Sequence, residues 1–321
     1  MMSDAIKHVP QQFTYQPVIE NARVLKPYDQ IFFIGMGGSH LAADLALLWN
    51  PNLPMSVTSD YGLPTQIKHA KRPLVIAGSY SGNTEETLDG YRLARKQQHA
   101  LAVIASGGTL IDLAKKDGVP YIQIPNTGIQ PRMATGFALR ALLKLVGDEK
   151  GLKESAQLAD TLNPHKLKKQ ANALTKKLIG TVPVIYSSHR NGSIASNWKI
   201  KFNETGKIPA FYNQLPELNH NEMNGFDVQP STQTLSQQFS FIFLSDKQDH
   251  PRIQKRMQIL ERFYLERSLP VTRVELVGNN PFEKSFTSLV IADWTAVGLA
   301  DHYGLDSEQV PMVEAFKTLM K

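Results

Sequence analysis

Three hydroxyl side chains lie close together in residues 78–87, which read GSYSGNTEET. Ser79, Ser81 and Thr84 fall in a predicted turn just before a predicted helix that begins with acidic residues. Hydroxyl and backbone N–H groups that converge at the start of a helix can bind a phosphate without a metal or a cationic side chain. Thr84 alone could be the N-cap of that helix, but an N-cap does not account for the two serines in the same turn. The segment therefore predicts a phosphate-binding loop.

A glycine-rich segment earlier in the chain, residues 31–39, joins a predicted strand to a predicted helix. Gly35, Gly37 and Gly38 would let the backbone approach a ligand closely, and the N–H groups at the helix start would face an anion. The spacing of these glycines differs from the dinucleotide-binding fingerprint, and the Gly-Lys-Ser/Thr ending of an NTP-binding loop is absent. The segment is either a tight turn capped by Ser39 or a second part of an anion site.

Both segments belong to a regular alternation of short apolar runs and longer amphipathic stretches. The short runs, rich in β-branched residues, predict buried strands at residues 31–35, 55–58, 73–79, 100–105 and 120–124. Helical patterns follow at residues 39–49, 84–98, 109–117 and 132–145. This order predicts a parallel sheet with right-handed crossovers and helices on both faces.

A second series of the same kind follows residues 148–165, a polar stretch that we interpret as the connection between two domains. Its predicted strands are residues 183–187, 208–212, 239–244 and 269–276. Its predicted helices are residues 192–204, 252–267, 283–303 and 310–320. The fold class we predict is therefore α/β, with two doubly wound parallel-sheet domains at residues 1–150 and 151–321.

Composition excludes several classes of chemistry. The 321 residues include no cysteine, so disulfides, Cys-ligated metals and a Cys nucleophile are excluded. The histidines lack the spacing of metal ligands, and we expect neither a metal nor a cofactor. We expect no membrane span and no signal peptide, hence a cytoplasmic protein. The net charge of +6 is small and dispersed, so nucleic acid is not an expected partner.

Residues 79–87 closely resemble the signature of sugar isomerase (SIS) domains. Together with residues 35–39 they resemble the bifunctional phosphoglucose/phosphomannose isomerase family. Three further segments support this resemblance in the order of the family: residues 130–132 (QPR), 202–207 (FNETGK) and 216–222 (PELNHNE). The resemblance therefore covers both halves of the chain and implies two SIS-type domains.

The resemblance implies an isomerase that interconverts glucose 6-phosphate and fructose 6-phosphate without a metal, through a cis-enediol. The residues that match the family's phosphate-binding positions are Gly38, Ser39, Ser79, Ser81 and Thr84. Whether mannose 6-phosphate is also accepted stays open. Relatives often have a Thr before a Pro-Val near the C-terminus, a feature associated with the mannose epimer, and residues 307–310 have none.

The same resemblance implies roles for four further residues. Glu204 matches the base that moves a proton between C1 and C2, and Arg132 matches a cation near the enediolate. His220 matches the residue that opens the sugar ring, contributed across the interface of a homodimer, and Lys317 matches a lysine that reaches the site. Taken alone, Glu204 reads as a surface carboxylate, Arg132 as a solvated arginine at a helix start, and Lys317 as an exposed lysine.

A different class of protein, a non-catalytic SIS sensor of a sugar phosphate, is the alternative. Such a sensor would use the three hydroxyls of the phosphate loop but would not need Glu204, Arg132 and His220 together. Their joint presence favours the enzyme. His40 departs from the family pattern and adds a titratable group beside the presumed phosphate site.

Overall fold

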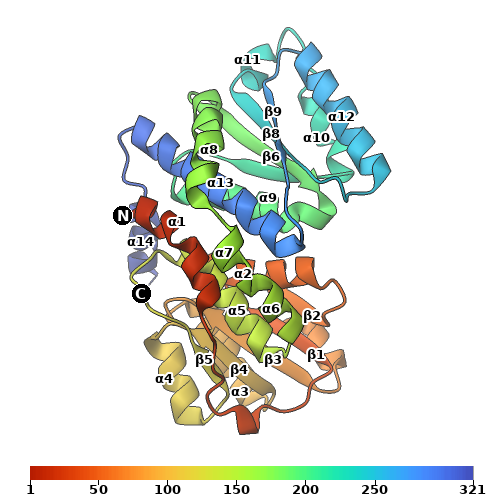
Figure 1. Cartoon of the computed structure of the whole chain (residues 1–321). Helices are drawn as coiled ribbons and strands as arrows, with labels where there is room; N and C mark the ends of the chain where they lie inside the picture. The colour runs from red at the N-terminus through yellow and green to blue at the C-terminus, as the bar shows by residue number, and fades with distance from the viewer. Residues whose placement is uncertain (321) are drawn as a thin grey trace. The chain divides into compact units, whose positions relative to one another are not determined.

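A computed structural model describes residues 1–320 of the chain (Figure 1). Contacts within the chain divide it into two compact units. His8–Thr161 form one, which we call the N-terminal unit; Met1–Lys7 and Leu162–Lys321 form the other, the C-terminal unit. The first helix, α1 (Met2–Lys7), contacts helices of the C-terminal unit, so the start of the chain belongs with its second half.

The N-terminal unit is built on a five-stranded parallel sheet of order β2-β1-β3-β4-β5. Its strands are β1 (Gln30–Ile34), β2 (Met55–Thr58), β3 (Pro73–Ser79), β4 (Ala100–Ala105) and β5 (Tyr121–Gln123). Its helices are α2 (Gly38–Trp49), α3 (Glu85–Lys96), α4 (Gly108–Asp117), α5 (Thr135–Leu145), α6 (Glu149–Ala156) and α7 (Leu158–Thr161). Four short 3₁₀ segments complete it: η1 (Val9–Thr14), η2 (Ala22–Val24), η3 (Thr65–His69) and η4 (Pro131–Met133).

Apolar side chains on both faces explain why this sheet is covered on both sides. Phe32 and Ile34 of β1 share one core cluster with Leu88 of α3 and Leu110 of α4. On the other face α2 and α5 pack against each other, and they contact β1 and β4 respectively (Figure 1). Because successive side chains of a strand point to opposite faces, the part of a strand that lies between two helical layers is apolar, as Ile31–Ile34 of β1 are. The predicted parallel sheet with helices on both faces is confirmed.

The C-terminal unit repeats the plan with a four-stranded parallel sheet of order β7-β6-β8-β9. Its strands are β6 (Val182–Ser188), β7 (Phe211–Leu215), β8 (Phe239–Ser245) and β9 (Val271–Glu275). After α1, its helices are α8 (Pro164–Leu178), α9 (Gly192–Glu204), α10 (Glu222–Gly225), α11 (Gln233–Ser236), α12 (Pro251–Glu266), α13 (Pro281–His302) and α14 (Pro311–Leu319). Two 3₁₀ segments, η5 (His189–Asn191) and η6 (Glu217–His220), follow β6 and β7.

An aromatic cluster covers one face of this second sheet, where Tyr186 of β6 and Phe241 of β8 pack against Tyr264 of α12. Helices α8, α9 and α13 pack together, and α9 contacts β6 (Figure 1). Two doubly wound α/β units are therefore present, as predicted. Among residues 1–320 no helix combines the length and the apolar character that a membrane span needs.

Two parts of the chain differ from the sequence-based expectation. The edge strand predicted at residues 208–212 lies at Phe211–Leu215 instead, because it pairs only with β6 and tolerates the polar Asn213 and Gln214. The polar connection at residues 148–165 is helical, since Asp148 caps α6 by accepting the N–H of Gly151 and the short helices bury their apolar residues.

Candidate functional site

A pocket lies at the carboxyl ends of β1 and β3, the point where the strand order of the first sheet reverses. This switch point is where doubly wound sheets bind their ligands. The loops after the two strands lie close together, since a Cβ on Gly35 would be 2.9 Å from the carbonyl oxygen of Gly78. The pocket is lined by the hydroxyl side chains of Ser39, Ser79 and Tyr80, by Gly38 and Gly78, and by five apolar side chains, Pro131 among them.

Hydroxyl groups of both loops meet at this pocket. The hydroxyls of Ser79 and Thr84 are hydrogen-bonded to each other at 2.8 Å, and Ser79 Oγ also accepts the N–H of Gly82 at 3.1 Å. Ser39 Oγ accepts the N–H of Tyr80 at 3.0 Å, which ties the first loop to the second. The structure therefore brings together hydroxyls that are 40 or more residues apart in the sequence.

The simpler interpretations of two of these residues are wrong. Thr84 occupies the N-cap position of α3, but its side chain makes no capping hydrogen bond and binds Ser79 instead. Ser39 does not cap α2, because the helix already begins at Gly38 and its N-cap residue is Gly37. Ser81 is exposed and accepts the N–H of Asn83 at 3.2 Å in the same turn.

The loop after β4 fixes the turn 79–84, the predicted phosphate loop, in place by contact between backbones. Gly82 has a φ of +70°, and a Cβ there would lie 1.8 Å from the carbonyl oxygen of Gly107. Gly108 likewise has a φ of +70° and faces the carbonyl oxygen of Ser81. Asn83 Oδ1 accepts both the N–H and the hydroxyl of Thr109, at 3.0 and 2.9 Å. Only glycine fits at positions 82 and 108, because any side chain there would collide with the backbone of the facing loop.

Arg132 lies beside the pocket and is buried, with 3% of its surface exposed. A Cβ on Gly38 would be 3.1 Å from Cα of Arg132 and from the carbonyl oxygen of Pro131. The interpretation of Arg132 as a solvated arginine at a helix start is wrong, since it lies in η4, before α5 begins at Thr135. The sequence could not show its burial, because it depends on the approach of a helix more than 80 residues earlier in the chain.

Glu204 is the last residue of α9 and is partly exposed. Lys207 Nζ donates to the backbone carbonyl of Glu204 and to that of Gln309, so it holds the end of the helix. One turn earlier, Lys201 Nζ donates to Asp293 Oδ1 of α13 at 2.6 Å, and this ion pair is almost completely buried. The backbone that carries Glu204 is thus fixed from two sides.

His220 and Lys317 belong, like Glu204, to the C-terminal unit. His220 is the last residue of η6 and is exposed. Lys317 lies in the last turn of α14, is 62% exposed and pairs with Glu314 of its own helix at 2.9 Å. The structure thus places Lys317 on an exposed helix, in agreement with the plainer interpretation of this residue.

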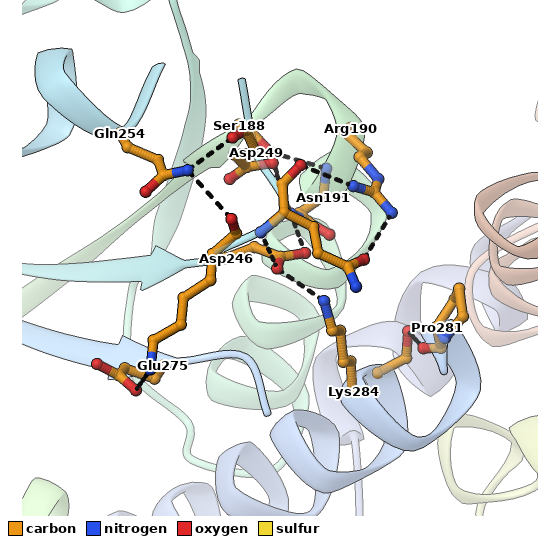
Figure 2. Close-up of polar contacts among 12 residues, drawn as sticks. Ser188, Arg190, Asn191, Asp246, Asp249, Gln254, Glu275, Pro281 and Lys284 are labelled. Atoms are coloured by element: carbon orange, nitrogen blue, oxygen red, sulfur yellow. Dashed lines mark hydrogen bonds and ion pairs between the residues drawn. The ribbon is translucent and has the colours of Figure 1, made fainter. Parts of the chain in front are cut away.

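The equivalent strand ends of the second sheet carry a different set of side chains, which the sequence analysis did not single out (Figure 2). Lys284 Nζ donates to Asp246 Oδ1 at 2.7 Å, and Ser188 Oγ donates to Asp249 Oδ1 at 2.7 Å. Asn191 Nδ2 also donates to Asp249 Oδ1, at 3.2 Å. A signal was present in the sequence, because both aspartates lie within five residues of the end of the predicted strand 239–244.

The two carboxyl groups of this second network have pKa values shifted in opposite directions. Burial raises the pKa of the Asp249 carboxyl, an effect that the hydrogen bond from Ser188 only partly offsets. Burial acts in the same direction on Asp246, but hydrogen bonds from Lys284, from the backbone N–H of Gln248 and from Asn191, together with the charge of Lys284, outweigh it and lower the pKa of that carboxyl. Asp246 and Asp249 accept hydrogen bonds from the chain itself, whereas the loop of the first sheet presents hydroxyls. Among residues 1–320 no group of three or more His, Asp or Glu is arranged to hold a metal ion.

Solved structures share this architecture. The tagatose-6-phosphate ketose/aldose isomerase of Escherichia coli superimposes with a TM-score of 0.69 over 96% of this chain and 95% of that one, at 16% sequence identity. The fold is thus that of the SIS-type phosphosugar isomerases.

Sequence comparison identifies the family. Residues 167–320 match the model of the bacterial phospho-glucose isomerase C-terminal SIS domain. The chain is 33% identical over 314 residues to the bifunctional phosphoglucose/phosphomannose isomerase of Aquifex aeolicus (strain VF5), covering 97% of this chain and 95% of that protein. It is also 30% identical over 229 residues to the D-glucosamine-6-phosphate 4-epimerase of Sulfolobus acidocaldarius, covering 70% and 72%. The chain belongs to the bifunctional phosphoglucose/phosphomannose isomerase family.

Proposed function

We propose that this protein is an aldose–ketose isomerase that interconverts glucose 6-phosphate and fructose 6-phosphate without a metal ion. The observation that carries the proposal is the pocket at the ends of β1 and β3, where hydroxyls of two loops meet at helix N-termini. Such an arrangement suits the phosphate of a sugar phosphate. Membership of the family supplies the second line of support.

The phosphate is bound by Gly38, Ser39, Ser79, Ser81 and Thr84 in this proposal. The hydroxyls of Ser79 and Thr84 now bond to each other, and both can turn to donate to phosphate oxygens. The N–H groups in the first turns of α2 and α3 lack partners within their helices and supply further donors.

The reaction also needs groups that open the sugar ring, transfer a proton between C1 and C2, and stabilise the enediolate. His220 moves a proton from the C1 hydroxyl to the ring oxygen as the C1–O5 bond of glucose 6-phosphate breaks, which gives the open-chain aldehyde. Glu204 removes the proton from C2 to form the cis-enediol and returns it to C1, and a proton passes from O2 to O1 over the two steps to give the ketose. Arg132 stabilises the negative charge on the enediolate oxygens, and Lys317 is a further candidate cation. The reaction moves protons and electron pairs only, so it requires no redox cofactor.

We also propose that the protein forms a homodimer in which His220 serves the site of the partner subunit. The exposed position of His220 on η6 supports this assignment. A monomer of full activity in solution, measured by light scattering alongside the assay, would contradict it.

The test is an assay of the purified protein with fructose 6-phosphate as substrate. We expect glucose 6-phosphate to form at the same rate with and without EDTA, and mannose 6-phosphate is measured in parallel. Loss of activity in EDTA would contradict the metal-free mechanism. Binding of fructose 6-phosphate without turnover would favour the sensor. Epimerisation of glucosamine 6-phosphate instead would favour the activity named for the Sulfolobus relative.

Replacing Ser79 with Ala should raise KM for fructose 6-phosphate by about 10- to 100-fold, because a hydrogen bond to a charged group is worth about 1.5–3 kcal/mol. We expect kcat to change much less, since the phosphate does not react. The matched control is Ser187→Ala at the end of β6, where the serine is equally buried but lies outside the proposed site. An unchanged KM in Ser79→Ala would remove this hydroxyl from the phosphate site.

A further inference from the structure

The segment that carries His220 runs from the end of β7 at Leu215 to the start of α10 at Glu222. His220 is exposed, so its own side chain does not hold the segment in place. Two side chains fasten the segment on either side of it. Leu218 is fully buried in the aromatic cluster of the second sheet, and Glu222 reaches back to the sheet.

Both oxygens of the Glu222 carboxylate accept hydrogen bonds from the sheet. Tyr186 Oη donates to Oε1 at 2.5 Å, and Asn213 Nδ2 donates to Oε2. Tyr186 and Asn213 are register partners on the neighbouring strands β6 and β7, so their side chains stand side by side on one face. The sheet thus presents two hydrogen-bond donors, one for each oxygen of the Glu222 carboxylate.

The donors themselves are held firmly. Tyr186 is completely buried, and its hydroxyl lies 3.3 Å from that of Tyr264 of α12. Burial, together with the nearby Tyr264 and Glu222, raises the pKa of Tyr186, so this hydroxyl keeps its proton and remains a donor. On the segment itself, Asn221 Oδ1 accepts the N–H of Glu222 at 2.5 Å, which fixes the start of α10.

We propose that Glu222 is a positioning residue that holds the segment 216–222 against the second sheet and so keeps the imidazole of His220 in place. The inference rests on the proposed function for its catalytic consequence, because His220 opens the sugar ring there. Glu222 touches no reacting atom in this scheme. Its role is to limit the freedom of a catalytic group two residues away, and a misplacement of about 1 Å can lower a rate by about 100-fold.

The test exchanges the two partners of one hydrogen bond. In Glu222→Gln the amide can accept from Tyr186, but its NH₂ group faces the NH₂ group of Asn213, and one bond is lost. In Asn213→Asp two carboxylates face each other. In the double variant Glu222→Gln/Asn213→Asp the amide and the carboxylate have changed places, so both hydrogen bonds can form again. Every substitution preserves the shape of the side chain.

We expect kcat for fructose 6-phosphate to fall about tenfold or more in each single variant and to return to within about threefold of wild type in the double variant. KM should stay within about threefold throughout, because the phosphate-binding residues are untouched. Glu217→Gln is the matched control: this carboxylate is exposed on the same segment, bonds only to Asn221 among the contacts described, and should leave kcat unchanged. Single variants with wild-type kcat, or a double variant with no recovery, would overturn the inference.

Hydrogen exchange of the backbone amides in residues 217–224 gives a readout independent of activity. Exchange should be faster in the single variants and return to the wild-type rate in the double variant. If the wild-type protein converted no sugar phosphate, the proposed function would fail while the exchange experiment still decided whether Glu222 holds the segment. Unchanged exchange in the single variants would refute that holding role.

Discussion

Glu204→Gln is expected to lower kcat for the interconversion of fructose 6-phosphate and glucose 6-phosphate by about 10²–10⁴-fold, the usual contribution of a general acid–base group. KM should change less than about threefold, because the amide has the shape of the carboxylate and the phosphate-binding loop is untouched. The end of α9 should also stay in place, since Lys207 binds the backbone carbonyl of this residue, which the substitution leaves unchanged.

Two measurements check this result. The rate of glucose 6-phosphate formation gives kcat, and incorporation of deuterium from D₂O at C2 of the product reports the proton transfer directly. Glu266→Gln is the control, since this carboxylate lies on α12 and is 57% exposed. Activity within about twofold of wild type in Glu204→Gln would assign the proton transfer to another group.

Asp293→Ala is expected to lower the free energy of unfolding of the C-terminal unit by about 3–5 kcal/mol, because it leaves the ammonium of Lys201 buried without its carboxylate. The pair joins α9 to α13 at 2.6 Å, with only 5% and 4% of the two side chains exposed. Urea-induced unfolding followed by circular dichroism measures the change.

Asp301→Ala on the same helix is the control, because Asp301 is exposed and its loss should cost less than about 0.5 kcal/mol. The double variant Lys201→Met/Asp293→Leu removes both charges, and we expect it to regain most of the lost stability. A stability of Asp293→Ala equal to that of the Asp301 control would show that the pair contributes nothing.

Local sequence patterns correctly predicted the strands that are buried on both faces. The central strands β1 and β3 are apolar runs because both faces of the first sheet are covered. The turn that carries Ser79, Ser81 and Thr84 was also predictable, since its hydroxyls and glycine follow one another closely in the sequence; its binding of phosphate stays a prediction. The family resemblance then supplied candidate residues that are distant in the sequence and that spacing alone left ambiguous, and their roles stay predictions.

Features that depend on long-range contacts could not be predicted. The burial of Arg132 follows from its contact with Gly38. The ion pair of Lys201 with Asp293 joins residues that are 92 positions apart in the chain. The shift of β7 has the same origin, because an edge strand takes its register from its single neighbour and not from its own apolar residues. Glu222 was part of a recognised motif, but only the pairing of β6 and β7 shows what its carboxylate binds.

The glycine contact between the phosphate loop and the loop after β4 has a kinetic consequence. Close backbone contacts at Gly82 and Gly108 restrict the conformations open to the turn that presents the hydroxyls before any ligand binds. Ordering a flexible loop costs conformational entropy each time a ligand binds, and a preformed loop avoids that cost. Capture of the phosphate at this turn should therefore proceed in a single bimolecular step, with the association rate rising linearly with ligand concentration and no slow phase after it.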